Sequence, residues 1–464
     1  MSATFRLIEE FRTARRPLRI LGASGQLGYG IPTPALEEGL RRNPDMIGCD
    51  MGSIDIGPYY LGAGVMAPSL VGAKRDLRKV LIAARRLDIP LIIGSAGSAG
   101  AKPHLEATLT LIREIAAEEG LSFTLASVAG DIPAATVHKA LAEGRIRPMD
   151  TMAPLDAAAI DASAEIVGQM GMEAFRRALE TGADVVVTGR ACDTGIFATL
   201  PVMLGFPIGL ATHMAKIVEC ASLCCTPGGR DTILAELDDE GFVLESMAPQ
   251  RAATPVSVAA HSLYEQADPY DIREPAGRTD LRGVTYRAVD ARRTRVSGAI
   301  FIPAEQLTIK LEGAASMGYR AVLLAGAADP RFIAQKDQIF EEVKVVVRDL
   351  VCADAPEDYT LGFRTYGVDA VIRHWPPTDS PAREVFVLGE CVAPTMARAE
   401  EVVRTTKQYL LHHGYQGRVS TAGNLAFPFT PPEVSVGPAY RFSIFHLMQV
   451  DAPETLFPVT LERL

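Results

Sequence analysis

The sequence predicts an α/β protein, with an N-terminal doubly wound, largely parallel sheet domain at 1–227 and a C-terminal α+β domain at 228–464. Up to about residue 226, short apolar runs alternate with longer segments of helical period, as in βαβ units. The turn Pro227-Gly228-Gly229 interrupts this pattern. Beyond it, strand-like runs joined by turns predominate, which favours a mostly antiparallel sheet.

Each element of the N-terminal domain follows from its apolar pattern. Five strands are expected where a short apolar run is bounded by turn residues, at 18–21, 45–49, 90–94, 123–128 and 183–189. The segments between them show the i, i+3, i+4 apolar spacing of helices that pack on a sheet. Those helices are expected at 34–42, 69–87, 104–119, 134–144 and 164–182.

The C-terminal domain is expected to combine many strands with two long helices. The strand-like runs are 241–247, 283–289, 294–301, 307–313, 319–326, 359–367 and 383–393. The helices are expected at 333–351 and 396–414, each after a strand. This order is typical of an α+β arrangement.

Composition and charge exclude several classes of protein. The net charge is −10 and no long block of like charge occurs, so we expect neither a nucleic-acid partner nor a membrane partner. Glycine and polar residues interrupt the apolar runs well short of the roughly 20 residues that a membrane span needs. The first residues lack the apolar core of a signal peptide, which predicts a cytoplasmic protein.

Cysteine use agrees with a reducing compartment, because seven is an odd number and most of the cysteines are scattered. Cys220, Cys224 and Cys225 form one close group, which raises the question of a metal site. No second pair and no nearby histidine completes a tetrahedral set. We therefore interpret the three thiols as buried small side chains.

The spacing Gly22-x-x-Gly25-x-x-Gly28 resembles a dinucleotide-binding turn, which requires a helix to start at the glycines. Pro32 and Pro34 cannot lie inside such a helix. The glycines therefore belong to a loop at the carboxyl end of the first strand, and no nicotinamide cofactor is expected. A tight turn chosen for close packing is the alternative explanation.

Polar side chains gather where three neighbouring strands end, which is the edge where open α/β sheets bind ligands. Asp50 and Asp55 follow one strand, and Arg190 and Asp193 follow another. We predict these four as catalytic: the carboxylates as base and acid, and Arg190 as a clamp on a substrate carboxylate. The alternative is structural, because Asp before Gly caps turns and Arg190-x-x-Asp193 fits a local ion pair.

Substrate-binding residues are predicted on the same loops and on one loop of the second half. The segment SAGSAG (95–100) lies ahead of a helix and would offer free backbone N–H groups to an anion. Asp50 and Asp55 are also candidate ligands for a divalent metal, Mg²⁺ or Mn²⁺. The predicted substrate-binding residues are Ser24, Ser53, Ser95, Ser98, Lys102 and Asn424.

Three charged residues of the second half also attract attention. Lys310 and Glu312 are two positions apart, so they lie on the same face of a predicted strand. They could form a proton-transfer couple or an ordinary exposed cross-strand pair. Glu390 follows an apolar run and would be the first polar group at the end of that strand. None of these patterns selects a reaction class.

Several long motifs together resemble the acyclic terpene utilization AtuA family. The resemblance covers nearly the whole chain, and Cys192 in TGRACD stands where the family form would have Ser. The motifs are DMGSIDIGPYYLGAG (50–64), PLIIGSAGSAG (90–100), AIDASAEIVGQMG (159–171), GADVVVTGRACDTGIFATLP (182–201), TPVSVAAHSLYEQADPY (254–270), TIKLEGA (308–314) and HHGYQGRVSTAGNLAFPFTP (412–431).

The resemblance implies a role in metabolism, because the family is named for bacterial genes that degrade acyclic terpenes through acyl-CoA intermediates. Members often resemble one half of a pair with a small companion protein, so such a partner is expected here. The resemblance supplies no catalytic residues.

Three functional hypotheses remain open from the sequence. The first is a hydro-lyase or isomerase acting on a small carboxylic or hydroxy acid or its acyl-CoA derivative. The second is a non-catalytic large subunit that binds a metabolite or acyl-CoA and positions a partner. The third is an NAD-dependent oxidoreductase, which the placement of the prolines disfavours. The mixed second domain and the lack of charge runs are compatible with a homo-oligomer.

Overall fold

A computed structural model describes residues 2–264, 268–372, 382–419 and 423–464. The chain forms two compact units, and the first comprises Met1–Ala315 together with Phe442–Leu464. The second unit is Ser316–Arg441. The turn at 227–229, where the sequence predicts a change of domain, lies inside the first unit because the strand after it pairs with the first strand of the sheet.

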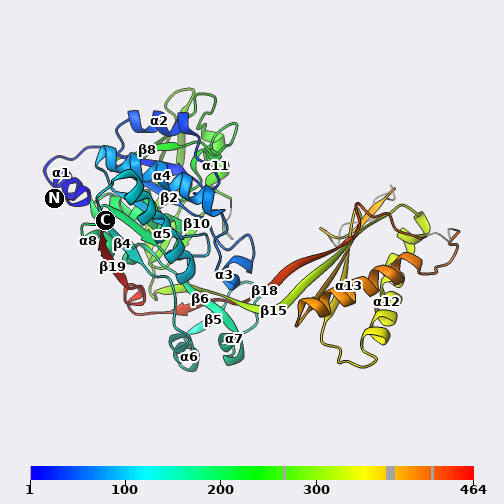
Figure 1. The fold of residues 1–464 in the computed structure, drawn as a ribbon. Helices are drawn as coiled ribbons and strands as arrows, with labels where there is room; N and C mark the ends of the chain where they lie inside the picture. Colours follow the sequence, from blue (N-terminus) through cyan, green and yellow to red (C-terminus); the bar gives the residue numbers. More distant parts are fainter. Residues whose placement is uncertain (1, 265–267, 373–381, 420–422) are drawn as a thin grey trace. The chain divides into compact units, whose positions relative to one another are not determined.

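A ten-stranded sheet organises the first unit, and its centre is parallel (Figure 1). The parallel strands, in their order across the sheet, are β1 (Leu18–Ser24), β2 (Met46–Asp50), β3 (Leu91–Gly94), β7 (Val185–Thr188) and β4 (Thr124–Val128). Antiparallel strands extend both sides: β8 (Ile233–Leu237), β9 (Phe242–Ser246), β13 (Arg293–Ser297) and β12 (Thr285–Ala288) beside β1, and β19 (Val459–Arg463) beside β4. The α/β class predicted from the sequence is confirmed.

Helices cover both faces of this sheet. Side chains of each strand alternate between the faces, so Ile92 belongs to one apolar cluster and its neighbours Leu91 and Ile93 belong to the other. The helices of this unit are α1 (Ala3–Thr13), α2 (Thr33–Arg41), α3 (Tyr59–Ala63), α4 (Leu70–Leu87), α5 (Lys102–Glu119), α6 (Ala134–Ala142), α7 (Ala157–Asp161), α8 (Met172–Glu180), α9 (Asp193–Met203), α10 (Ile208–Val218) and α11 (Pro255–Ser262), with short 3₁₀ helices η1 (Ala221–Cys224) and η2 (Pro453–Leu456). No helix in the described part of the chain is both long and apolar enough to cross a membrane.

One predicted helix is wrong in its first half. The segment predicted as a helix at 164–182 begins as strand β6 (Ser163–Gln169), and only α8 is helical. β6 pairs antiparallel with β15 (Thr308–Ala327), with Glu312 opposite Val167. The β-branched pair Ile166-Val167 suits a strand, and this long-range pairing overrides the helical period of the segment.

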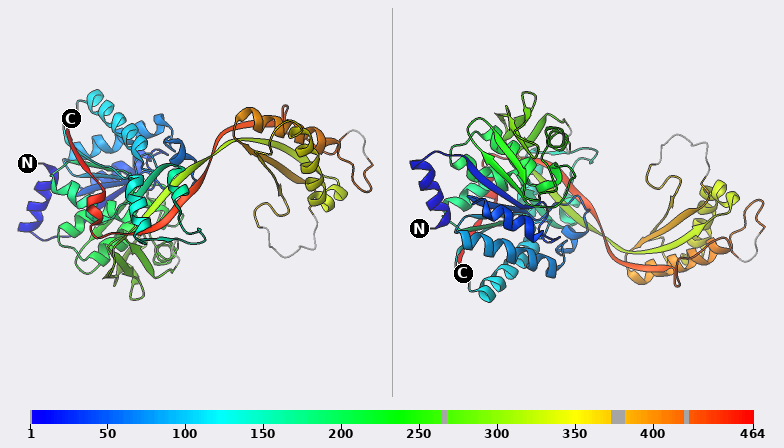
Figure 2. Two further views of the ribbon diagram at one scale, coloured as in Figure 1. Left: turned by 90° about the horizontal axis from the view of Figure 1, so that it is seen from below. Right: turned by 90° about the horizontal axis from the view of Figure 1, so that it is seen from above.

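Further strands form a small sheet and a second large one. The small sheet contains β10 (Asp271–Glu274), β11 (Gly277–Asp280) and β14 (Ile300–Pro303). The other contains β16 (Thr360–Tyr366), β17 (Val385–Ala393), β15, β18 (Glu433–Gln449) and β5 (Ile146–Pro148) in that order. The two separate strands expected at 307–313 and 319–326 are therefore one strand, which runs beside β18 in both views of Figure 2. The single strand expected at 294–301 is instead two, β13 and β14, because Gly298 turns the chain with a φ of +95°.

In the second unit, α12 (Pro330–Val351) and α13 (Met396–His412) share an apolar cluster with β15 and β17. Leu323 and Val387 belong to this cluster and are completely buried. Glu390, expected at a strand end, lies inside β17 and forms ion pairs with Arg320 and Arg364. It is a cross-strand charge of this unit.

Candidate functional site at the carboxyl edge

Three loops cross in backbone contact at the carboxyl edge of the parallel strands. The N–H of Arg190 donates to the carbonyl of Gly100 at 3.0 Å. A Cβ atom added to Gly100 would lie 2.1 Å from the Arg190 nitrogen, and one added to Gly130 would lie 2.6 Å from it. Only glycine permits such an approach, so these residues fix the position of Arg190.

Arg190 is bound by a carboxylate that belongs to the protein itself. Its Nε donates to Oε2 of Glu312 at 2.7 Å, and its Nη2 donates to Oε1 at 3.3 Å. Lys310 Nζ lies 2.8 Å from Oε1 of the same carboxylate. Burial alone would favour the neutral acid, but Arg190 and Lys310 hold the pKa of Glu312 below its ordinary value. The Lys310 and Glu312 side chains thus do share a face, and they form an ion triad with Arg190.

Asp50 is the most unusual group at this edge. It is 4% exposed, its Oδ2 accepts the Gly52 N–H at 2.8 Å, and its Oδ1 has no hydrogen-bond partner among the described residues. Burial raises the pKa of Asp50 well above its ordinary value, and the nearby carboxylates Asp193 and Glu219 raise it further against the effect of Arg190. A carboxyl group in this setting holds its proton to unusually high pH and can donate it.

Asp193 and two residues that the sequence analysis missed continue the network. Asp193 is the first residue of α9. Nζ of Lys216, from α10, lies 3.6 Å from Oδ2 of Asp193 and 2.7 Å from Oε1 of Glu219. Lys216 lies in the apolar helix α10, and Glu219 is the residue directly after it. Neither residue follows a strand, so a search for polar groups at strand ends could not find them.

A second carboxyl group with a raised pKa contacts the first turn of α9. Glu274, the last residue of β10, accepts a hydrogen bond from the Thr194 hydroxyl at 2.5 Å. Its Oε2 is buried and has no hydrogen-bond partner in the described part of the protein. Burial raises the pKa of Glu274 to about 7, although Thr194 and Cys192 oppose that shift. Only its place at the end of a short strand in DIRE (271–274) could have drawn attention to it.

Ser95 lies beside Arg190, and Ser98 touches the loop after β2. The Ser95 hydroxyl oxygen accepts from Nη1 of Arg190 at 3.4 Å, and the Ser98 hydroxyl donates to the Ser53 carbonyl at 2.7 Å. Both residues have positive φ, +50° for Ser95 and +87° for Ser98. Positive φ is energetically costly for serine, so the surrounding structure holds the loop 95–100 in a strained backbone conformation.

Four of the six backbone amides of SAGSAG are already engaged in hydrogen bonds, although free amides were expected there. The N–H groups of Ser95, Ala96, Ser98 and Gly100 donate to backbone carbonyls. The N–H of Lys102, at the start of α5, donates to Oδ1 of Asp131 at 2.9 Å. An internal carboxylate therefore already occupies the helix terminus that an anion would use.

The other predicted residues lie outside this network. Asp55 is exposed, Lys102 is exposed, and the Ser24 oxygen accepts the N–H of Gln26 at 3.2 Å. Asn424 belongs to the second unit, where its Nδ2 donates to the His413 carbonyl at 2.9 Å.

The metal role of Asp50 and Asp55 stays a prediction. Asp50 is buried and Asp55 faces solvent, so the two carboxylates differ sharply in their surroundings. No group of three or more His, Cys, Asp or Glu side chains that could hold a metal ion occurs in the described ranges.

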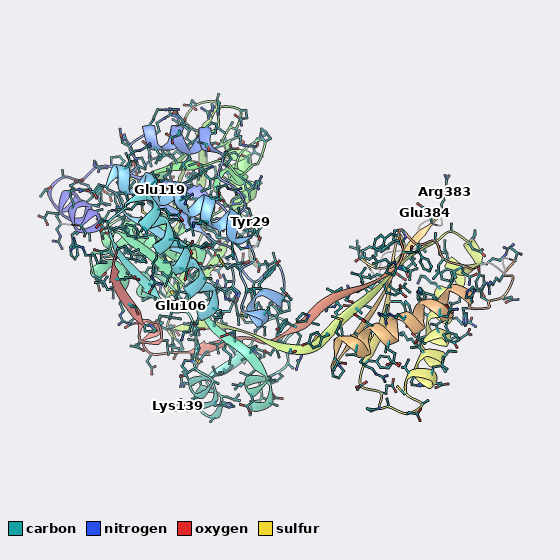
Figure 3. The ribbon with its side chains drawn as sticks, viewed as in Figure 1. Tyr29, Glu106, Glu119, Lys139, Arg383 and Glu384 are labelled. Atoms are coloured by element: carbon teal, nitrogen blue, oxygen red, sulfur yellow. The ribbon has the colours of Figure 1, made fainter. Side chains whose placement is uncertain are left out.

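The glycine loop after β1 is anchored by Asp76, a buried residue of α4. Oδ2 of Asp76 accepts the N–H of Gly28 at 3.0 Å and that of Gly30 at 2.7 Å. Tyr29, labelled in Figure 3, lies between these two glycines. Gly25 contacts the backbone of Cys220, because a Cβ atom there would lie 2.9 Å from its carbonyl carbon. The amides that a pyrophosphate would use are thus bonded to a carboxylate.

We expect Asp76→Ala to loosen this loop while the sheet stays folded. Both glycine amides lose their acceptor, and the loss of a hydrogen bond to a charged group costs roughly 1.5–3 kcal/mol of stability. Amide hydrogen exchange should become faster at Gly28 and Gly30, and stay unchanged at Ile92 in β3. Unchanged protection at the two glycines would contradict the anchoring role.

The fold and the cluster define a doubly wound α/β protein with buried acid and base groups at the carboxyl edge of its sheet. A family model described as acyclic terpene utilisation family protein AtuA matches residues 72–429. The chain therefore belongs to the AtuA family. No curated protein and no solved structure matches it significantly.

Proposed function

We propose that the chain is an enzyme, a hydro-lyase or isomerase that acts on a small carboxylic or hydroxy acid or its acyl-CoA derivative. The observation that carries the proposal is Asp50, a buried carboxyl group with one unbonded oxygen and a raised pKa beside Arg190. Perturbed acids of this kind are concentrated at catalytic sites.

In this proposal Asp50 donates a proton and Glu274 accepts one. With a pKa of about 7, Glu274 is partly ionised at neutral pH, as a general base requires. For a dehydration, Glu274 removes the proton on the carbon next to the carboxyl or thioester group. The C–H electrons form the new double bond, and the hydroxyl group leaves as water with the proton of Asp50.

Arg190 has a supporting role here rather than the clamp predicted from the sequence. Its guanidinium is engaged by Glu312, so its positive charge acts on Asp50 from a fixed position. The substrate carboxylate would be held by the polar groups nearer the surface, such as Lys216, whose side chain is 16% exposed. The contribution of Lys216 to substrate binding is electrostatic.

The test is deuterium incorporation from D₂O into hydroxy acids, unsaturated acids and their CoA thioesters, followed by proton NMR. We expect Asp50→Asn to lower the turnover of any compound that reacts by at least about 100-fold, because general acid catalysis typically contributes that much. Glu106→Gln, on the exposed surface of α5 in Figure 3, is the control and should keep full turnover. Full turnover by a folded Asp50→Asn protein would refute the assignment.

A further inference from the structure

Two adjacent cysteines at the end of η1 have their sulfur atoms side by side. Sγ of Cys224 lies 3.9 Å from Sγ of Cys225, within the distance of a sulfur hydrogen bond, and both thiols are reduced. Side chains of adjacent residues commonly point apart, so this orientation is specific to the local turn. Cys224 is completely buried, and Cys225 is 5% exposed.

The surroundings make the two thiols unequal. The hydrogen bond with Cys224 lowers the pKa of Cys225, and Ser222, Arg251 and Arg292 act in the same direction against burial. The pKa of Cys224 is raised well above its ordinary value, through the same hydrogen bond and through burial. Such a pair combines a thiol that ionises readily with a neighbour that keeps its proton, as in many reactive dithiols.

Both guanidinium groups are fixed in place. Nη1 of Arg251 donates to the carbonyls of Pro227 and Gly228, each at 2.7 Å, in the loop that follows Cys225. Nη2 of Arg292 donates to the carbonyl of Ser246 at 2.8 Å. The positive charge near Cys225 is therefore a permanent feature of this turn.

We propose that Cys224 and Cys225 form a reversible modification site, which small hydroperoxides oxidise to a disulfide between the two adjacent residues. The Cys225 thiolate attacks the peroxide and breaks its O–O bond, which gives a sulfenic acid on Cys225. The other oxygen leaves as hydroxide or alkoxide, and it takes up the proton that the Cys225 thiol released, which gives water or an alcohol. The Cys224 sulfur then attacks the sulfenic sulfur. The S–S bond forms, and the hydroxyl group leaves with the Cys224 proton as water. Two thiols and one hydroperoxide are consumed.

The geometry of adjacent residues makes this bond easy to reverse. Their Cα atoms are about 3.8 Å apart across a trans peptide, closer than the roughly 4.4–6.8 Å of ordinary disulfides. Strained disulfides are reduced more easily than relaxed ones, so a dithiol should restore the pair. The small exposed area of Cys225 also selects a small oxidant over a bulky one such as oxidised glutathione.

The test uses the reduced full chain, treated with hydrogen peroxide, alkylated and mapped by peptide mass spectrometry. We expect the peptide with Cys224 and Cys225 to lose the mass of two hydrogen atoms in most molecules and to regain it with dithiothreitol. Oxidised glutathione should leave both thiols open to alkylation after unfolding. A disulfide that involves Cys220, or a glutathione adduct on either residue, would overturn the proposal.

Matched variants separate the two roles. Cys224→Ala should stop disulfide formation and leave a sulfenic acid on Cys225 that dimedone traps, whereas Cys225→Ala should give no dimedone adduct on Cys224. Cys352→Ala, which removes a half-buried cysteine of the second unit, should leave the disulfide unchanged. Equal trapping at both positions would contradict the assignment of Cys225 as nucleophile. If a variant fails to fold, the wild-type peptide map alone decides.

Discussion

Glu312→Leu is expected to lower the free energy of unfolding by about 3–5 kcal/mol, because it leaves a buried guanidinium without its counterion. The Arg190 side chain is 3% exposed, and it donates two hydrogen bonds to Glu312. The side chain cannot reach solvent without disrupting the close backbone contacts of Gly100 and Gly130 with Arg190. Urea unfolding followed by circular dichroism at pH 7 measures the change.

The two partners of this pair should not be equivalent. Arg190→Met leaves Glu312 bonded to Lys310 at 2.8 Å, so we expect a smaller loss than with Glu312→Leu. The double variant Arg190→Met, Glu312→Leu leaves no unpaired guanidinium and should be more stable than Glu312→Leu alone. Glu106→Gln is the surface control. A double variant that loses the sum of both single changes would show that the charges do not act as a pair.

The apolar pattern was sufficient for the centre of the fold. Runs such as PLIIG and ADVVVTG are buried on both faces, as parallel strands are, and they form β3 and β7 at the expected places. Pairing between distant segments was not visible in the sequence. The helical period of 164–182 did not reveal β6, because its strand form depends on pairing with the distant β15, where Ala314 lies opposite Glu165.

The site shows the same division between local and distant signals. The rule that polar groups collect at strand ends selected Asp50, Ser95 and Arg190, which the structure places around one ion network. It could not select Glu312 as the partner of Arg190, or Glu274 as the partner of Thr194, because these carboxylates reach the edge from strands of other sheets. It also gave equal weight to Asp55, since burial, which distinguishes Asp50 from it, depends on the packed loops.

Glu274→Gln is expected to make the protein more stable than the wild type at pH 8 and to have little effect near pH 4. The pKa of Glu274 is about 7 in the folded protein and about 4.5 in the unfolded chain. Below pH 4.5 Glu274 is protonated in both the folded protein and the unfolded chain, so it does not make the stability depend on pH. Between pH 4.5 and 7 only the unfolded chain releases the proton, so wild-type stability falls as the pH rises, by about 3 kcal/mol in total. Glutamine has no proton to release and still offers Thr194 an acceptor.

Asp50 produces a decline of the same sign, but it is present in both proteins, so the difference between them isolates Glu274. Urea unfolding at pH 5, 6, 7 and 8 should therefore give curves that separate as the pH rises. Thr194→Val provides the matched test, because loss of its hydroxyl removes a bond that favours the ionised form. The decline should then extend to higher pH. Parallel curves for wild type and Glu274→Gln would mean that the pKa of Glu274 is the same in the folded protein and in the unfolded chain, and the raised pKa on which its role as general base rests would be wrong.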